Sequence, residues 1–254
     1  MDRVEDKLAK SLTAESTDLI PYIPYLLQDL WELGSSPRDM LDLILKHVPV
    51  TKETRILDLA CGKGAVIVFL ARELGCRVKG IDILPEFIEF AAGKAKEWGV
   101  EDLCEFTIGD INQSVRRERD YDIAILGAVG DVLGDPEETI TLLKKTVKTG
   151  GYILIDDGYG QDETNSKYHT REKWLEIFQK TGVRLIEEKA ISDDDLADIT
   201  DEQQRYIVQR ANELKERLPE KGTLFEGYIQ SQQAEWDELE NEIIGVTLLL
   251  QVVG

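Results

Sequence analysis

The chain has 254 residues, 42% of them hydrophobic, which suits one large domain or one domain with an insertion. Its formal net charge is -20, and so acidic a surface repels phosphate backbones, which argues against a nucleic-acid partner. Cys61, Cys76 and Cys104 match no zinc or disulfide framework, and no secretory leader or bilayer-spanning apolar stretch is present. We therefore expect a cytoplasmic protein without a membrane partner or a bound metal.

Residues 1–50 are predicted to form a helical lid or cap. One helical face carries Leu26, Leu27, Leu30 and Trp31. A further helix is predicted to start at Ser36, because a capping serine, a first-turn proline and Asp39 follow one another there.

From Thr54 onward, short apolar runs alternate with helical patterns. Seven strands are predicted: Arg55–Ala60, Arg77–Ile83, Glu105–Ile108, Asp122–Leu126, Tyr152–Ile155, Val183–Lys189 and Val246–Val253. The helix that carries Ile140, Leu143 and Val147 is predicted to stop at Gly150-Gly151. This alternation indicates a doubly wound α/β fold with a mainly parallel sheet, spanning residues 51–191 and 246–254.

Residues 192–245 interrupt this pattern between the sixth and seventh strands. Two apolar stripes at helical spacing flank a break at Pro219 and Gly222. The stripes are Ile207, Ala211, Leu214 and Leu218, then Phe225, Ile229, Trp236, Leu239 and Ile243. The segment holds 15 acidic against 5 basic residues, so we expect a helical hairpin with a solvated outer surface. A homodimer through these long apolar stripes is a further expectation.

Two features follow the first two predicted strands. Gly62 and Gly64 allow the backbone to turn tightly and approach a ligand, and Asp82 places a carboxylate after the second strand. In open α/β sheets the carboxyl ends of adjacent parallel strands are where nucleotide-like ligands bind. A dinucleotide site is the competing interpretation, but its fingerprint requires glycine where Ile67 stands, and it leaves Asp58 unexplained.

The run ILDLACGKG, which begins at Ile56, closely resembles the first motif of class I S-adenosylmethionine-dependent methyltransferases. VKGIDI resembles their second motif, and GDIN, at 109–112, resembles the segment that borders the adenine. The resemblance covers roughly residues 50–190 and extends to the last strand. One departure is Ala60, which stands where many members have glycine. The resemblance implies a Rossmann-like sheet of seven strands whose last strand is antiparallel, with S-adenosylmethionine as cofactor.

The resemblance also implies roles for individual residues in binding S-adenosylmethionine. Asp58 would orient the methionine amino group, Ala60 and Gly62 would line the methionine moiety, and Gly127 would offer its carbonyl to the amine. Around the nucleoside, Asp82 would hold the ribose hydroxyls, Ile83 and Ile111 would contact the adenine, and Asp110 would bond its amino group.

The family transfers the methyl group by direct in-line displacement, in which alignment of acceptor and methyl matters most. An acceptor that loses a proton needs a base, and the candidates near the predicted pocket rim are Asp131, Asp156, Asp157 and His169. Tyr22, Tyr25 and Tyr159 are candidates for acceptor binding. We expect an enzyme acting on a small molecule; a protein methyltransferase and a non-catalytic cofactor-binding interaction module remain as alternatives.

Overall fold

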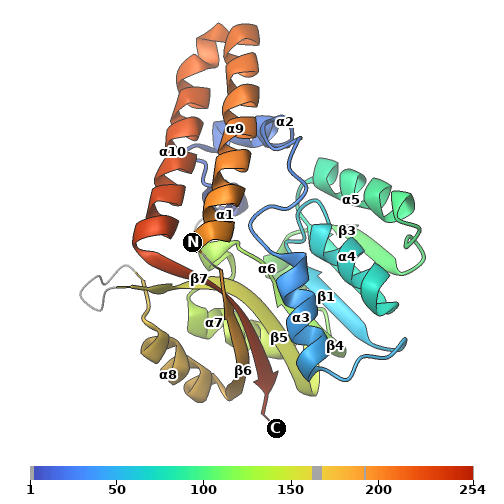
Figure 1. Cartoon of the computed structure of the whole chain (residues 1–254). Helices are drawn as coiled ribbons and strands as arrows, with labels where there is room; N and C mark the ends of the chain where they lie inside the picture. The colour runs from blue at the N-terminus through green and yellow to red at the C-terminus, as the bar shows by residue number, and fades with distance from the viewer. Residues whose placement is uncertain (1–2, 162–167, 192, 254) are drawn as a thin grey trace.

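A computed structural model describes residues 3–161, 168–191 and 193–253 as a seven-stranded sheet flanked by helices (Figure 1). The strands are β1 (Arg55–Leu59), β2 (Arg77–Asp82), β3 (Cys104–Ile108), β4 (Tyr121–Leu126), β5 (Val147–Gly160), β6 (Val183–Ala190) and β7 (Ile243–Val252). Their order across the sheet is β3-β2-β1-β4-β5-β7-β6. β7 is antiparallel to both neighbours, whereas the pairs from β3 to β5 are parallel. The predicted fold class is confirmed.

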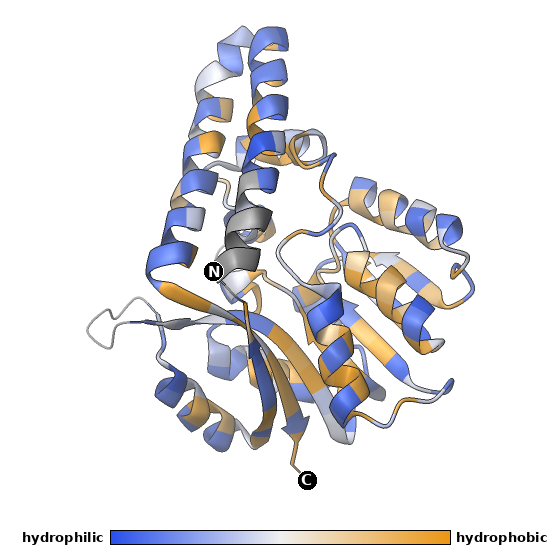
Figure 2. Cartoon of the chain, viewed as in Figure 1, coloured by the Kyte–Doolittle hydropathy of each residue, from blue (hydrophilic) through white to orange (hydrophobic). Residues whose placement is uncertain are grey.

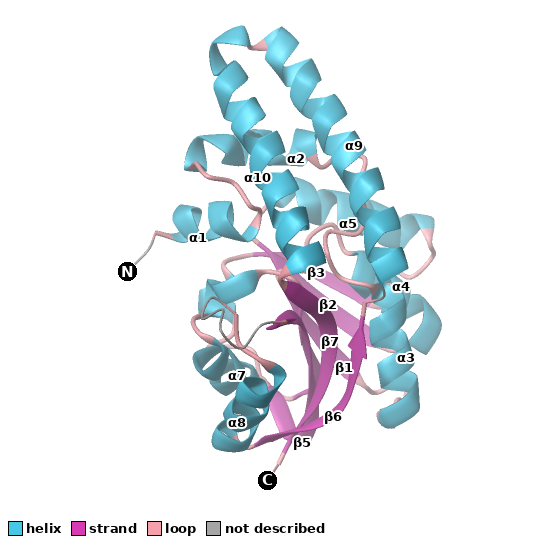
Figure 3. Ribbon diagram, turned by 60° about the vertical axis from the view of Figure 1, so that its left-hand side comes forward, coloured by secondary structure: helices cyan, strands magenta, loops and turns pink. Residues whose placement is uncertain are grey.

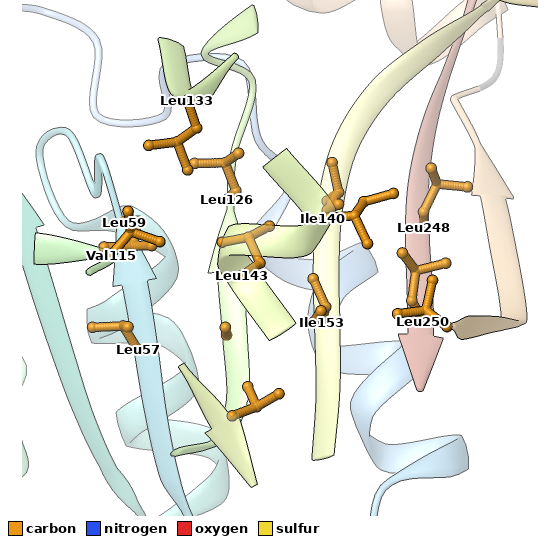
Figure 4. Close-up of a cluster of buried hydrophobic side chains, with 14 of the residues drawn as sticks. Leu57, Leu59, Val115, Leu126, Leu133, Ile140, Leu143, Ile153, Leu248 and Leu250 are labelled. Atoms are coloured by element: carbon orange, nitrogen blue, oxygen red, sulfur yellow. The ribbon is translucent and has the colours of Figure 1, made fainter. Parts of the chain in front are cut away.

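Helices cover both faces of the sheet, as the turned view makes clear (Figure 3). One face carries α3 (Pro37–His47), α4 (Ala65–Leu74) and α5 (Pro85–Glu97), whose apolar side chains share a buried cluster with the strands. The other face carries α6 (Ile111–Ser114), α7 (Pro136–Lys144) and α8 (Arg171–Thr181). Figure 4 shows this second core, in which Leu143 of α7 lies against the strands. Because both faces are covered, the middle of the central strands is mainly apolar (Figure 2).

A third buried cluster lies outside the sheet and joins the N-terminal helices to the inserted hairpin. The N-terminal part comprises α1 (Val4–Ser11), η1 (Thr17–Tyr22) and α2 (Ile23–Leu26). The hairpin comprises α9 (Asp193–Arg217), η3 (Pro219–Lys221) and α10 (Gly222–Asn241), and it rises beside α2 in Figure 1. Phe225 of α10 is completely buried in this cluster, together with Leu26 and Ala211. The hairpin expected between the sixth and seventh strands is present, and its apolar stripes pack within the same chain.

Most predicted strand boundaries agree with the structure to within a residue, but three elements differ by more. The fifth strand begins at Val147, so Gly150-Gly151 lies inside it and Asp156 is a strand residue. The strand continues because β7 pairs with it from Tyr152 to Gly160. Near the N-terminus, α2 ends at Leu26, before the rest of the predicted apolar face. At the other end, Ile243 begins β7 instead of closing the hairpin stripe.

Two further observations bear on the predicted organisation. Although it lies within residues 1–50, α3 packs on the sheet, with Ile44 fully buried there; the domain boundaries stay predictions. Among the helices in the described ranges, none combines the length and apolarity that a bilayer crossing requires.

Candidate active site at the carboxyl ends of the parallel strands

The loop between β1 and α4 is built by left-handed backbone conformations. Ala60, Gly62 and Gly64 have φ angles of 60°, 53° and 75°. Glycine adopts this region without strain, whereas alanine does so only at a cost of about 1–2 kcal/mol, so Ala60 is the strained residue of the three. The Cys61 N–H donates to the Ile81 carbonyl at 3.0 Å, so the loop is tied to the neighbouring strand β2.

Asp82, the last residue of β2, holds the same loop from the other side. Its carboxylate accepts hydrogen bonds from the backbone N–H groups of Gly62 at 2.8 Å and Leu84 at 2.9 Å. The side chain is buried, and this burial raises its pKa against the lowering effect of those N–H groups. The two predicted motifs therefore meet at one point of the sheet edge.

A pocket opens where this loop faces the end of β4. Its lining comprises Trp31, Leu33, Ser35, Asp58, Ala60, Cys61, Gly62, Lys63, Ala65, Val66, Ile125, Gly127, Ala128 and Val129. Four residues predicted to bind the methionine moiety, Asp58, Ala60, Gly62 and Gly127, thus surround one cavity. Their roles in binding stay predictions, but the spacing of the motifs brought them together as expected.

One buried carboxylate, Asp58, lines the pocket, and two more, Asp82 and Asp156, act on it electrostatically. Asp58 is only 3% exposed, and burial, followed by the charges of Asp82 and Asp156, raises its pKa well above the usual range. Asp156, from β5, accepts a hydrogen bond from the Thr247 hydroxyl at 2.6 Å, and burial raises its pKa to about 6. Because the charges of Asp82 and Asp156 disfavour the ionised form of Asp58, a ligand that carries positive charge would be favoured beside it.

The residues predicted to hold the adenine lie beside this pocket and do not line it. Asp110 caps α6, accepting hydrogen bonds from the Asn112 backbone N–H at 2.8 Å and from its side-chain amide at 3.0 Å. Ile111 is buried, and Ile83 is half-buried against the third cluster. Their contacts with a nucleoside stay predictions.

A second pocket adjoins the first through Gly127. It is lined by Leu126, Gly127, Gly130, Asp131, Pro136, Thr139, Ile140, Ile155, Asp156, Asp157 and Trp174. Three of the four predicted catalytic candidates, Asp131, Asp156 and Asp157, are therefore brought together. The fourth, His169, is exposed, and its ring meets Trp174 edge-on at 6.4 Å without lining the pocket.

The predicted acceptor-binding tyrosines make their contacts elsewhere. Tyr22 packs edge-on against Phe225 at 5.1 Å, and Tyr25 donates its hydroxyl hydrogen to Glu213 of the hairpin. Tyr159 is buried in the core beneath α8 and donates to Glu188 at 2.8 Å. None of the three belongs to the lining of either pocket described above. Their role in acceptor binding stays a prediction that these contacts do not favour.

Sequence reasoning expected a lid or cap from residues 1–50 but did not name, among the site residues, those that form the opposite wall of the first pocket. Trp31, Leu33 and Ser35 line it from the connection between α2 and α3, and Lys63 lines it from the glycine loop. The available signals were the small residues after Leu33 and a lysine placed between two glycines.

Comparison with known proteins agrees with this geometry. A family model described as a methyltransferase domain matches residues 50–242, which is more than half of the chain. Norajmaline N-methyltransferase of Rauvolfia serpentina is 29% identical over 107 residues, covering 42% of this chain and 37% of that protein. YjhP of Escherichia coli is 35% identical over 109 residues, covering 42% of each. The chain spans about half the length of the curated relatives it matches.

Solved structures show the same fold. The S-adenosylmethionine-dependent methyltransferase of Geobacter sulfurreducens, in complex with S-adenosylhomocysteine, aligns with a TM-score of 0.76 at 20% identity. The alignment covers 91% of this chain and 97% of that one. This chain belongs to the methyltransferase domain family, and its fold is that of class I S-adenosylmethionine-dependent methyltransferases.

Proposed function

We propose that this protein binds S-adenosylmethionine in the first pocket and transfers its methyl group to a small-molecule acceptor in the second. The observation that carries the proposal is the convergence of the glycine loop, Asp58 and Gly127 around one cavity, with Asp82 holding that loop through the Gly62 N–H. Family membership supplies the reaction class, and the strand order places the cavity where such sheets bind ligands.

The chemistry of the pocket fits this cofactor. S-adenosylmethionine carries a sulfonium and an ammonium group, and these positive charges would offset the repulsion that Asp82 and Asp156 exert on ionised Asp58. A cavity lined by Ala60, Gly62 and Gly127 leaves room for close approach of a ligand to the backbone. The dinucleotide alternative fits less well, because a pyrophosphate would add negative charge to the same place.

When bound, the cofactor supplies a methyl group bonded to a positively charged sulfur. The residues of the chain align the acceptor with that methyl group and exclude water, which together lower the barrier to displacement. Asp156 is the best placed of the candidate bases, because it lines the second pocket beside Gly127 and its pKa is raised to about 6. It would accept the proton that an acceptor loses as the new bond forms.

A small-molecule acceptor is favoured by the enclosure of the site. Trp31, Leu33 and Ser35 cover the first pocket, and Trp174 and Ile140 wall the second. The name of the Rauvolfia relative, an alkaloid N-methyltransferase, points to the same class of acceptor. A protein substrate would need access for an extended peptide, which this enclosure restricts.

Substitution of Asp82 tests the assignment of the cofactor. We expect Asp82→Asn to weaken binding of S-adenosylmethionine roughly tenfold to a hundredfold, because a charge-assisted hydrogen bond contributes about 1.5–3 kcal/mol. Asp102→Asn makes the same charge change at an exposed loop and should bind as the wild type does. Isothermal titration calorimetry of the wild type and both variants with S-adenosylmethionine, S-adenosylhomocysteine and NAD measures the affinity of each protein for each ligand.

Equal affinity of wild type and Asp82→Asn would overturn the site assignment. Binding of NAD alone would overturn the cofactor. Cofactor binding with no methyl transfer to any member of an amine, phenol and thiol panel would favour the non-catalytic interaction module.

A further inference from the structure

Lys63 occupies an unusual position for a lysine. It lies inside the glycine loop, yet its side chain is buried, with 3% of the residue exposed. The ammonium group donates to the backbone carbonyl oxygens of Leu27 and Gln28, both at 3.0 Å, and to that of Leu30. Since an ammonium has three N–H donors, all of them are used by one short stretch of backbone. The ion pairs among the described residues do not include Lys63.

A second contact runs in the opposite direction. The Trp31 indole N–H donates to the Lys63 backbone carbonyl at 3.0 Å, and the Trp31 ring packs edge-on against Trp98 at 5.1 Å. The Lys63 ammonium also lies 4.1 Å from the centre of the Phe90 ring. Side chain and backbone of one loop residue are thus both engaged by residues 27–31.

The segment from Leu27 to Ser35, here called the strap, closes the pocket. Leu33 lies so near the glycine loop that a Cβ on Gly62 would come within 3.3 Å of its Cδ1. At the other side, the Ser35 hydroxyl accepts from the Ala128 N–H at 3.4 Å, beyond the end of β4. The strap therefore bridges the two halves of the site, and Lys63 holds one end of that bridge.

We propose that Lys63 is a positioning residue that latches the strap over the pocket, so that closure of the strap and cofactor binding stabilise each other. This inference rests on the proposed function only for the identity of the cofactor. Such coupling is reciprocal. If the closed strap increases the affinity for the cofactor, the bound cofactor stabilises the closed strap by the same free energy. The glycine loop then contacts the ligand and, through Lys63, couples ligand binding to the stability of the strap.

Lys63→Met tests the latch, because it keeps the length of the side chain and removes its three donors. Lys94→Met is the matched control: the Lys94 ammonium lies 5.2 Å from the same Trp31 ring but pairs with Glu97 at 2.8 Å. We would measure hydrogen exchange of the full chain by mass spectrometry, with and without saturating S-adenosylmethionine, and its affinity by calorimetry.

In Lys63→Met we expect faster exchange across residues 27–35 and cofactor affinity lower by roughly tenfold, within the range typical of coupled sites. Saturating cofactor should still protect the backbone around Asp82 but no longer protect the strap, a difference that general loss of stability would not produce. Lys94→Met should match the wild type in each measurement. If Lys63→Met proves unfolded, Trp31→Phe removes the reciprocal bond while keeping an aromatic ring, and it should shift exchange and affinity in the same directions.

Unchanged exchange of the strap in Lys63→Met would overturn the latch. Faster exchange with unchanged affinity would overturn the coupling and leave the proposed function intact. If the wild type binds no S-adenosylmethionine, the proposed function and the coupling to that cofactor both fall, while exchange in the ligand-free protein still decides whether Lys63 holds the strap.

Discussion

Buried carboxylates at the site have a measurable cost for folding. Asp156 has its pKa raised to about 6 by burial, whereas an unfolded chain would leave it near 3.8. An acid whose pKa is higher in the folded state than in the unfolded state stabilises the fold at a pH below its unfolded-state pKa. This stabilisation is lost as the pH rises through its folded-state pKa. Ionised Asp156 should therefore destabilise the protein at neutral pH, an arrangement expected where a carboxylate serves function more than stability.

Asp156→Asn should consequently be more stable than the wild type at pH 7, by about 3 kcal/mol at most, given about 1.4 kcal/mol for each unit of pKa difference. Its advantage should shrink as pH falls from about 6 to about 4, where the wild-type carboxyl becomes protonated. Thermal unfolding of both proteins across this range measures the difference. An advantage that is constant with pH would show that Asp156 titrates at its ordinary value.

For individual site residues, some positions could be predicted from the sequence and others could not. The positions of Asp58, Ala60, Gly62 and Gly127 around one pocket could be predicted, because strand ends and glycine turns leave strong patterns. The role of Lys63 could not, since its partners are backbone carbonyls, which every residue has and no sequence pattern reveals.

Among the elements, β2 and α4 pack unusually closely. A Cβ on Gly80 would lie 1.9 Å from Ile67 Cδ1 and 2.8 Å from Cys61 Sγ, so the strand needs glycine where it passes beneath the loop and helix. The isoleucine that argued against a dinucleotide fingerprint is thus accommodated by a glycine on the adjacent strand. The helix and the strand still approach closely, but the small residue is Gly80 on the strand instead of a glycine on the helix.

Gly80→Ala should lower the free energy of unfolding by about 1–3 kcal/mol, the usual effect of overpacking a core. Gly93→Ala provides a control of opposite sign: a Cβ there meets nothing within 4 Å, and its interior position in α5 should make alanine stabilising by about 0.5–1 kcal/mol. Urea unfolding of both variants gives the two values. Equal effects would mean that Ile67 and Cys61 move aside without cost.

The elements themselves were largely predictable, with one instructive exception. Alternating apolar runs located all seven strands, but Gly150-Gly151 indicated a helix end and lies instead within β5. Gly150 has a φ angle of 77°, and the pairing of β5 with β4 is irregular nearby. The glycines therefore mark a distortion of a strand, which local composition does not distinguish from a stop.

For the whole molecule, the third cluster makes the N-terminal helices and the hairpin one packing unit. Asp29 of the strap pairs with Arg210, so the strap is anchored to the hairpin as well as to Lys63; before the strap, Tyr22 packs on Phe225. The apolar stripes that suggested a homodimer are covered within the chain, where Phe225 and Ala211 are completely buried. The homodimer stays a prediction, but the stripes no longer require it.

Phe225→Ala should lower the free energy of unfolding by about 3–5 kcal/mol, because it leaves a large cavity between the N-terminal helices and the hairpin. Thr223→Ala changes an exposed residue of the same helix and should alter it by less than about 0.5 kcal/mol. Urea unfolding compares them, and hydrogen exchange should show the loss concentrated in η1, α2 and α10. A loss spread equally through the sheet would contradict a separate packing unit.

The position of β7 has a consequence for how the chain is made. Of the seven strands of the sheet it comes last along the chain, yet it pairs with β5 on one side and β6 on the other. Until residues 243–252 leave the ribosome, β6 has no neighbour to pair with and one side of β5 stays open. The sheet can therefore be completed only after translation of the hairpin. Until then the unpaired edges of β5 and β6 are exposed and can pair with strands of other chains.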